Sequence, residues 1–439
     1  MRRTAGACWP CEPGSMTPQA DRSSEATRLS VLLSAFACEP GIGSEPEVGW
    51  RWAIQMARFH DVTVLTQSKN QPAIDKELAR LSGTQPAPRF VYHSLSPGAQ
   101  RLRRFRFGFK LHYILWQRSA LKIVERLHAT RPFDLLHHAT FAGFRYPTVI
   151  WGHNAASIWG PLGGAEGISL GLLPWRNPRG LLQEGTRNLH NFFHTNGFSA
   201  LRRRARASTV VLATTTEMQQ VFAACGFGAG LMPTIGVIPE EFPPCTPRVS
   251  KGPLKLLYAG NLLAMKGIDL ALEAMKVSRV QASFTIVGDG PYRRAAERLA
   301  GRLGVGSQTL FTNRLPREQV LRMYPDYDLF IFPSLHDSGG YAAIEAMLNG
   351  LPVVCLDCGG PGVAVPAHCG RKIPLGPRRK VIEEMGAALV WYDQNRSALM
   401  EEGKLARESV LEHYDWSRKT EQMCRYYREA IRLYRGSSR

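Results

Sequence analysis

The sequence predicts an α/β protein built from two Rossmann-like domains, and three observations lead to this prediction. The alternation of strand, glycine loop, helix and strand occurs at residues 29–66. It restarts after a proline-rich, irregular stretch at 236–253. Its clearest copy spans residues 328–363, where two apolar strands flank a glycine loop and a short helix that carries an acid. Such units bind phosphate and ribose groups at the carboxyl ends of parallel strands.

The first domain is expected at residues 28–240, after a disordered tail at 1–27. Its elements follow from apolar runs and glycine positions. They are a strand at 29–37, a loop with Gly41 and Gly43, a helix at 46–59, a strand at 61–66, a strand ending at His138, a glycine loop at 159–164 and a strand at 209–214. Gly41 and Gly43 lack the third glycine of a dinucleotide fingerprint, which argues against a nicotinamide dehydrogenase.

The second domain is expected at residues 254–415, after a linker at 241–253, and a C-terminal helix is expected at 416–439. The same patterns predict its elements. They are a strand at 254–259, a helix at 268–275, a strand at 283–287, a helix at 293–303, a strand at 309–312, a strand at 328–334, a short helix carrying Glu345, a strand at 351–356 and a second glycine loop at 359–362.

Composition and charge narrow the class of protein. The 439 residues are 44% hydrophobic and 21% charged, an ordinary globular composition. A net charge of +19 indicates a polyanionic partner, such as an anionic membrane surface. The sequence has no zinc-finger, RRM or KH signature, so a nucleic acid is not expected. It also lacks an apolar run long enough for a membrane span and an apolar N-terminal core, so the chain is expected in the cytoplasm.

The nine cysteines, an odd number, do not resemble a disulfide framework. Cys8 and Cys11 form a CxxC pair inside the tail, without the βαβ context of a redox site. Cys355, Cys358 and Cys369 invite a zinc site, but buried thiols acting as small apolar residues are the favoured interpretation. No metal site is therefore predicted.

Asp337 and Glu345 form an acid-x7-acid pair within the segment PSLHDSGGYAAIEAMLNGLPVV. This segment resembles the E-x7-E region of the retaining family 4 glycosyltransferases (glycosyl transferases group 1), with Asp in place of the first Glu. The resemblance extends to Lys266-Gly267, to the turn at 288–291 and to the terminal helix, and it is looser in the first half. It implies the GT-B architecture: two facing Rossmann-like domains with a cleft between them. The C-terminal domain then binds a nucleotide-sugar and the N-terminal domain an acceptor.

The resemblance also implies roles for individual residues. Lys266 contacts the donor diphosphate, Glu345 binds the ribose hydroxyls, and Asp337 lies near the transferred sugar. The phosphates face the backbone amides of Gly339, Gly340 and Tyr341. The remaining donor-site positions are Gly41, Gly43, Asn261 and Gly288.

Two positions leave alternatives open. Asn261 stands where the family usually has an arginine, so one diphosphate cation is missing; either another basic residue replaces it or the charge of the leaving group is less neutralised. His138, or its neighbour His137, lies where the family often keeps a histidine near the reacting sugar. The alternative for His138 is a histidine whose hydrogen bonds are satisfied at a strand end.

The activity implied is retaining transfer of a hexose from a nucleotide-sugar to a saccharide or a lipid-linked acceptor, in cell-surface polysaccharide or glycolipid synthesis. The resemblance implies no metal and no cofactor besides the nucleotide-sugar substrate. Two alternatives are a nucleotide-sugar epimerase and, because of Asn261, a catalytically inactive nucleotide-binding protein of the same fold.

The segment 101–118 bears on the acceptor because it carries six Arg or Lys residues and no acid. As a helix it would place Leu102, Phe105, Phe109, Tyr113 and Trp116 on one face. A basic helix with an aromatic face is typical of an interfacial membrane segment. The alternative is a core-packed helix with a solvated basic face. A second basic cluster, at 202–206, fits the first interpretation and a peripheral position at the inner face of the membrane.

Overall fold

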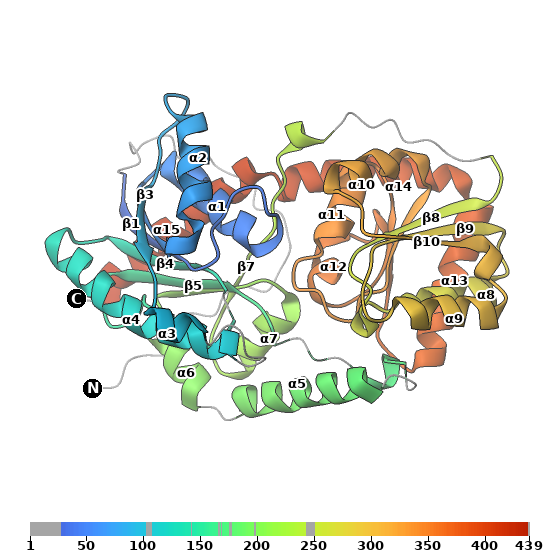
Figure 1. Cartoon of the computed structure of the whole chain (residues 1–439), viewed down its shortest axis with the longest axis horizontal. Coiled ribbons are helices and arrows are strands. Elements are labelled where there is room, and N and C mark those ends of the chain that lie inside the picture. Colours follow the sequence, from blue (N-terminus) through green and yellow to red (C-terminus); the bar gives the residue numbers. More distant parts are fainter. Residues whose placement is uncertain are drawn as a thin grey trace.

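The structure is a computed structural model that describes residues 28–101, 108–141, 143–165, 167, 169–174, 178–196, 199–242 and 251–437. Two parallel sheets, each covered by helices, lie beside each other (Figure 1). The tail at 1–27, with Cys8 and Cys11, lies outside the described residues.

The N-terminal sheet has seven strands in the order β3-β2-β1-β4-β5-β6-β7, and its registered pairs are parallel. The strands are β1 (Ser30–Ala35), β2 (Asp61–Gln67), β3 (Arg89–His93), β4 (Leu135–Thr140), β5 (Ala156–Leu162), β6 (Val210–Ala213) and β7 (Gly230–Leu231). The helices are α1 (Ser44–Ala57), η1 (Ser68–Asn70), α2 (Gln71–Leu81), α3 (Pro97–Gln100), α4 (Gly108–Thr130), η3 (Leu170–Leu172), α5 (Pro178–Asn196), α6 (Ser199–Arg206), α7 (Thr216–Ala224) and η4 (Pro239–Glu241). The central strands β4 and β5 are buried along their whole length, as expected for a parallel sheet covered on both faces.

The C-terminal sheet has six strands in the order β10-β9-β8-β11-β12-β13, and its registered pairs are also parallel. The strands are β8 (Leu254–Ala259), β9 (Ala282–Val287), β10 (Thr309–Thr312), β11 (Leu329–Phe332), β12 (Val353–Leu356) and β13 (Gly370–Ile373). The helices are η5 (Ala264–Lys266), α8 (Ile268–Ser278), α9 (Arg293–Leu303), η6 (Gly306–Gln308), α10 (Arg317–Met323), η7 (Tyr324–Asp326), α11 (Tyr341–Leu348), α12 (Gly359–Ala364), α13 (Arg378–Gln394), α14 (Arg396–His413) and α15 (Trp416–Ser437).

The predicted class, two Rossmann-like α/β domains, is confirmed, but two predicted glycine loops are wrong. Residues 159–162 belong to β5, because His138 of β4 and Ala213 of β6 pair with this strand across the Gly-Pro sequence. The glycines at 359–362 begin α12. In both places glycine and proline mark a close backbone approach; a Cβ at residue 160, for example, would lie 2.3 Å from the Leu212 carbonyl oxygen.

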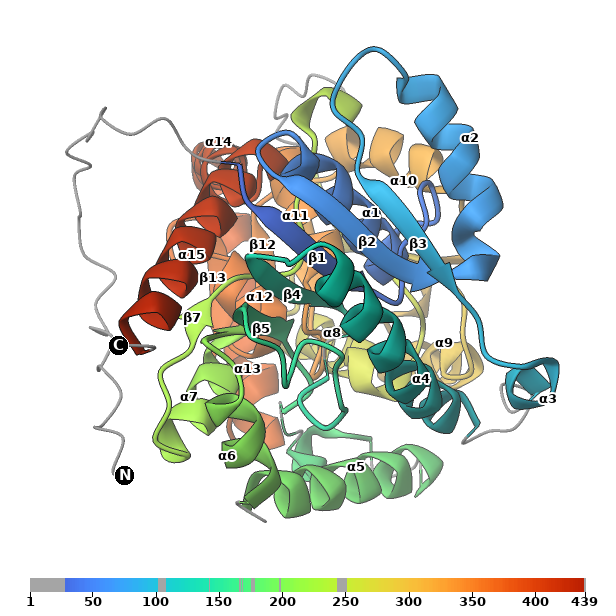
Figure 2. The ribbon, with the colours of Figure 1, turned by 90° about the vertical axis from the view of Figure 1, so that its left-hand side faces the viewer.

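The last helix, α15, returns from the C-terminal domain and packs against the N-terminal sheet (Figures 1 and 2). The ring of Trp416 meets that of Trp52 edge-on at 4.9 Å between centroids. The Tyr427 hydroxyl lies 2.8 Å from Nδ1 of His137. The chain passes between the domains near Val237 and again near Asp415, and these two residues pair in a parallel bridge. The two crossings therefore run side by side.

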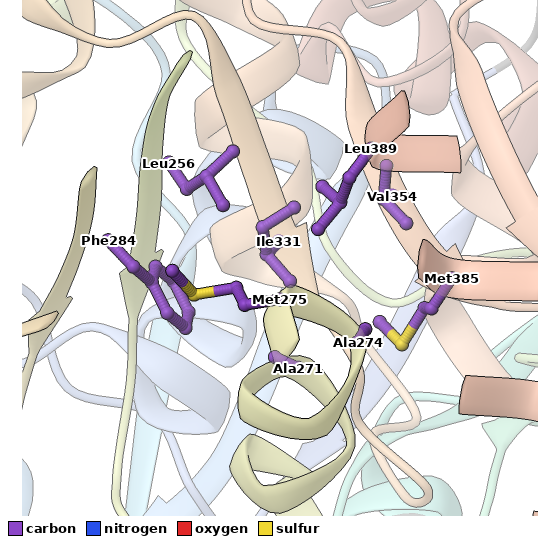
Figure 3. A pocket seen from close by; sticks show the side chains of 9 residues that line it. All are labelled: Leu256, Ala271, Ala274, Met275, Phe284, Ile331, Val354, Met385 and Leu389. Carbon is purple, nitrogen blue, oxygen red and sulfur yellow. The ribbon is translucent and has the colours of Figure 1, made fainter. Parts of the chain in front are cut away.

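The core of the C-terminal domain leaves one small gap between α8, α13 and the sheet (Figure 3). It measures about 10 Å³ and is lined by apolar side chains such as Leu256, Ile331 and Met385. A space of this size and polarity stays dry. The gap lies within the apolar packing of the C-terminal core.

Candidate functional site

The predicted donor residues lie where the strand order of the C-terminal sheet reverses. The loop after β8 carries Lys266, and the neighbouring strand β11 leads to the loop with Asp337. Ligands of open parallel sheets bind at this switch point. Gly267 makes the close approach of the two loops possible: its φ is +67°, and a Cβ there would lie 2.1 Å from the carbonyl oxygen of Pro333.

Lys266 and Asp337 form an ion pair at this point, with Nζ 2.6 Å from Oδ2. The other oxygen of Asp337 accepts hydrogen bonds from the amides of Gly339 at 3.0 Å and Gly340 at 2.7 Å. Burial raises the pKa of Asp337, but Lys266 and the two amides outweigh burial, so the pKa is lowered overall. Asp337 is therefore a firmly ionised carboxylate that gathers the cation and the amides expected to face a diphosphate.

Glu345, in the first turns of α11, is buried and paired with Arg317 at 2.7 Å. Burial raises the pKa of Glu345, and Arg317 opposes that effect only in part. The same guanidinium donates to the hydroxyl of Tyr341 at 3.2 Å. Sequence reasoning missed Arg317, which begins α10; its only local signal is a basic residue after Pro316, because its partner is 28 residues away in the sequence.

Arg317 also ends a row of charges that reaches into the N-terminal domain. Glu47 of α1 pairs with Arg51 at 2.7 Å, and Arg51 pairs with Glu241 of η4 at 2.6 Å. Glu241 lies 4.0 Å from Arg317. A second contact between the domains joins the Glu217 carboxylate to the Gly359 amide, at 2.7 Å. The two domains thus meet around the acid-x7-acid segment.

The Gly41 and Gly43 loop follows β1, at the switch point of the N-terminal sheet. Both glycines have positive φ, +78° and +74°, and a Cβ on either would meet no atom within 4 Å. The amide of Gly41 donates to Glu47 at 2.6 Å, and the first turn of α1 also holds Glu45. The role of this loop against a diphosphate stays a prediction.

Asn261 and Gly288 also lie at the carboxyl edge of the C-terminal sheet. The side chain of Asn261 is exposed. A Cβ on Gly288 would lie 1.9 Å from the carbonyl oxygen of Gly260, so the ends of β8 and β9 touch there. The contacts of Asn261 and Gly288 with a donor stay predictions.

His138 and His137 are both buried in β4. Nδ1 of His138 lies 2.9 Å from the Thr148 hydroxyl, and Nε2 lies 3.4 Å from the Tyr113 hydroxyl. Burial lowers the pKa of His138 to about 3 and that of His137 to about 4, so both rings are neutral at physiological pH. The geometry matches the alternative of a histidine satisfied at a strand end, and the role of His138 near a reacting sugar stays a prediction.

His336 was not singled out in the sequence, although it precedes Asp337. Its Nδ1 is buried without a hydrogen-bond partner among the described residues. Burial, and then the charges of Arg187 on α5 and of Lys266, lower its pKa to about 3. His336 is therefore a neutral ring within the electrostatic influence of Lys266 and of Arg187 on α5.

Among the described residues, no group of three or more His, Cys, Asp or Glu side chains is placed to hold a metal ion. Cys355 and Cys369 are buried free thiols, as the sequence predicted, whereas Cys358 is half-buried.

The segment 101–118 only partly fits its predicted interfacial role, and residues 102–107 lie outside the described ranges. Tyr113 and Trp116, on α4, are fully buried and pack edge-on against Phe36 at 4.9 and 5.1 Å. The interfacial interpretation of these two rings is wrong, because they complete the N-terminal core. Within the described ranges, the structure contains no helix with the length and apolar character needed to span a bilayer.

Comparisons with known proteins concern the fold and the family of the C-terminal domain. Residues 246–369, which contain Lys266, Asp337 and Glu345, match the family model described as Glycosyl transferases group 1. A curated relative, Sulfoquinovosyl transferase SQD2 of Arabidopsis thaliana, is 29% identical over 161 residues, which are 37% of this chain and 30% of that protein. The chain aligns with less than half of the length of the first curated relatives it matches.

Solved structures resemble nearly the whole chain. Sucrose-phosphate synthase of Thermosynechococcus elongatus has a TM-score of 0.60 at 17% identity, covering 92% of this chain and 100% of that one. Anabaena Alr3699/HepE, solved in complex with UDP-glucose, has a TM-score of 0.56 at 14% identity, covering 91% and 99%. Residues 246–369 therefore match the glycosyl transferases group 1 model, and the chain as a whole has the two-domain GT-B fold.

Proposed function

We propose that the protein is a retaining glycosyltransferase that moves a hexose from a nucleotide-sugar to a saccharide or lipid-linked acceptor. The observation that carries the proposal is the Lys266–Asp337 pair at the switch point, with the buried Glu345 on the next helix. A cation and backbone amides gathered around one carboxylate suit a diphosphate, and a buried carboxylate suits ribose hydroxyls.

When the donor binds, we propose that Lys266 and two backbone amides exchange Asp337 for the donor diphosphate. The diphosphate competes with Asp337 for Lys266 and for the amides of Gly339 and Gly340, all of which now serve the Asp337 carboxylate. Asp337 then becomes available to the hydroxyls of the transferred sugar. Arg317 is proposed to supply the cation that Asn261 does not provide, since it already lies beside Glu345 and Tyr341.

The proposed chemistry stabilises a leaving group. As the bond from the anomeric carbon to the phosphate oxygen breaks, negative charge grows on the nucleoside diphosphate. Lys266 and the amides at the start of α11 are proposed to stabilise that charge, which would lower the barrier more than it tightens ground-state binding. The acceptor hydroxyl attacks the same face of the sugar, and its proton passes to the departing phosphate. The two-carboxylate scheme of glycoside hydrolases is not needed.

The acceptor and setting complete the proposal. The named activity of the Arabidopsis relative is sulfoquinovosyl transfer, and the Anabaena structure holds UDP-glucose. For this chain they support a nucleotide-sugar donor and a role in cell-surface polysaccharide or glycolipid synthesis. The net charge of +19 supports an anionic membrane surface as a partner, at the inner face of the cell membrane.

A panel of UDP-, GDP-, ADP- and dTDP-sugars tests the function. Calorimetry with the nucleoside diphosphates should identify one preferred base, and NMR of the product formed with its sugar should show retained anomeric configuration. Binding of no nucleotide contradicts the proposal. Binding accompanied by epimerisation without an acceptor, or by inversion during transfer, also contradicts it.

A further inference from the structure

Helix α5 has its polar and apolar faces reversed relative to an ordinary surface helix. Glu184 and Asn191 are buried, at 3% and 5% exposure. Leu189 and Phe193, on the opposite side, are 56% and 64% exposed. A surface helix of a soluble protein normally turns its apolar stripe inward. Something other than solvent is therefore expected to cover the outer side of α5.

The inner side of α5 carries polar contacts, one of which ties the helix to Arg145 outside it. Glu184 forms an ion pair with Arg187 at 3.1 Å, and Arg145 donates a hydrogen bond to the side-chain oxygen of Asn191. The segment before α5 is anchored in the other domain, where Leu172 is buried in the C-terminal core and its carbonyl accepts from Arg378 at 2.5 Å. Turning the apolar side of α5 inward would break the contact between Arg145 and Asn191.

The outer side is an apolar stripe that runs the length of the helix. Residues seven and eleven positions apart return to the same face of an α-helix. Leu182, Leu189 and Phe193 follow this spacing, and Phe192 lies next to Phe193. The four side chains are between 56% and 70% exposed. We call these four side chains the α5 stripe.

Basic residues flank the α5 stripe. Helix α6 contacts α5 and carries the exposed Arg202, Arg203 and Arg206. The exposed Lys110 of α4 lies close enough to His190 of α5 to lower the pKa of that imidazole, after burial and Arg145. In both views α5 forms the lowest edge of the molecule, with α6 at one end (Figures 1 and 2).

We propose that the α5 stripe docks on the surface of an anionic lipid bilayer, with its apolar side chains at the acyl boundary and the flanking basic residues on lipid headgroups. Leucine and phenylalanine on one face with arginine and lysine beside them are the composition of an interfacial helix. A second copy of the chain fits less well, because a two-fold contact would bring the α6 arginines of both copies together. The inference rests on the proposed function and deepens it, because a docked α5 would hold a lipid-linked acceptor beside both domains.

Co-sedimentation with vesicles tests the docking surface directly. Vesicles of phosphatidylglycerol and phosphatidylcholine, and of phosphatidylcholine alone, are mixed with the full chain at low and high salt. We expect binding to the anionic vesicles that weakens with salt. Replacing the four residues of the α5 stripe with Gln should weaken it by at least about a hundredfold, because most of the inserted apolar area is lost. The matched control replaces three exposed apolar residues of the C-terminal domain and should bind like the wild type: Leu310→Gln, Leu375→Gln and Met400→Gln.

A second variant keeps the test decisive if the Gln variant does not fold. Arg203→Glu with Arg206→Glu leaves the stripe intact and should abolish the preference for anionic vesicles. Unchanged vesicle binding in either folded variant, or no binding by the wild type at low salt, overturns the inference. So does light scattering that shows a wild-type dimer which the Gln variant converts to a monomer. Nucleotide binding, measured without vesicles, should be the same in all variants; its absence in the wild type contradicts the proposed function and leaves the docking result standing.

Discussion

The ammonium of Lys266 lies 2.6 Å from a carboxylate oxygen of Asp337, and this pair joins the two loops at the switch point of the C-terminal sheet. Asp337 also holds two backbone amides with its other oxygen. The lowered pKa of Asp337 shows that the cation and amides outweigh burial. A cation and backbone amides are the groups that bind an anionic diphosphate. In the free protein, the carboxylate of Asp337 occupies these groups at the proposed phosphate site.

Replacing Glu345 with Gln should weaken binding of the preferred ribonucleoside diphosphate by about 1.5–3 kcal/mol, because the ribose hydroxyls lose a charged acceptor. Binding of the 2′,3′-dideoxy analogue, which lacks these hydroxyls, should change little. Calorimetry with both ligands and both proteins measures the difference. An equal loss for the two ligands places Glu345 away from the ribose.

Replacing Arg317 with Gln should raise the pKa of Glu345 further, because the guanidinium that opposes burial is removed. We expect weaker nucleotide binding and slower transfer, with the loss in binding largest at low pH. Arg317→Lys should restore only part of the activity, since a single ammonium cannot contact both Glu345 and Tyr341 as the planar guanidinium does. The exposed Arg314 is the matched control, and Arg314→Gln should behave like the wild type. An Arg317→Gln variant with normal kinetics removes this residue from the site.

Lys419 should make stability depend on pH above neutrality. It is buried on α15, donates to the carbonyl of Pro233, and burial lowers its pKa from 10.5 to about 7. Between these two values the unfolded chain binds the proton and the folded chain does not, so stability rises with pH from about 7 to 10.5. Urea unfolding of wild type and Lys419→Met at pH 7 and pH 10 should show a smaller rise for the variant. An identical rise in both proteins assigns the pH dependence to other groups.

Transfer should persist in excess EDTA, because the proposed leaving-group stabilisation uses Lys266 and backbone amides. Rates with and without chelator, using protein dialysed against EDTA, provide the measurement. Loss of activity that Mg²⁺ or Mn²⁺ restores assigns the charge stabilisation to a metal ion.

Much of the fold could be predicted because its signals are local. The strand at 254–259 and the helix at 293–303 begin and end where apolar runs and glycines place them. The residues at 159–162 could not be assigned in this way, since Gly and Pro are turn signals alone and β5 exists through its pairing with β4 and β6. Tertiary pairing overrides the local preference there.

The candidate site shows the same division. The acid-x7-acid spacing is visible in the sequence, whereas the ion pair between Asp337 and Lys266 appears only in the fold. The link from Arg317 to Glu345 joins two helices, so no spacing rule reveals it. The reversed α5 was also hidden, because an amphipathic pattern gives two faces but does not say which one the rest of the chain covers.

Steady-state and single-turnover kinetics of Lys266→Met test the central claim most directly, with the exposed Lys276→Met on α8 as the matched control. The proposed role in the transition state predicts that turnover falls by at least about a hundredfold, while the Kd for the nucleoside diphosphate changes far less. The control should match the wild type in both. Wild-type turnover in Lys266→Met, or a loss explained entirely by weaker nucleotide binding, contradicts the claim that Lys266 stabilises the leaving group.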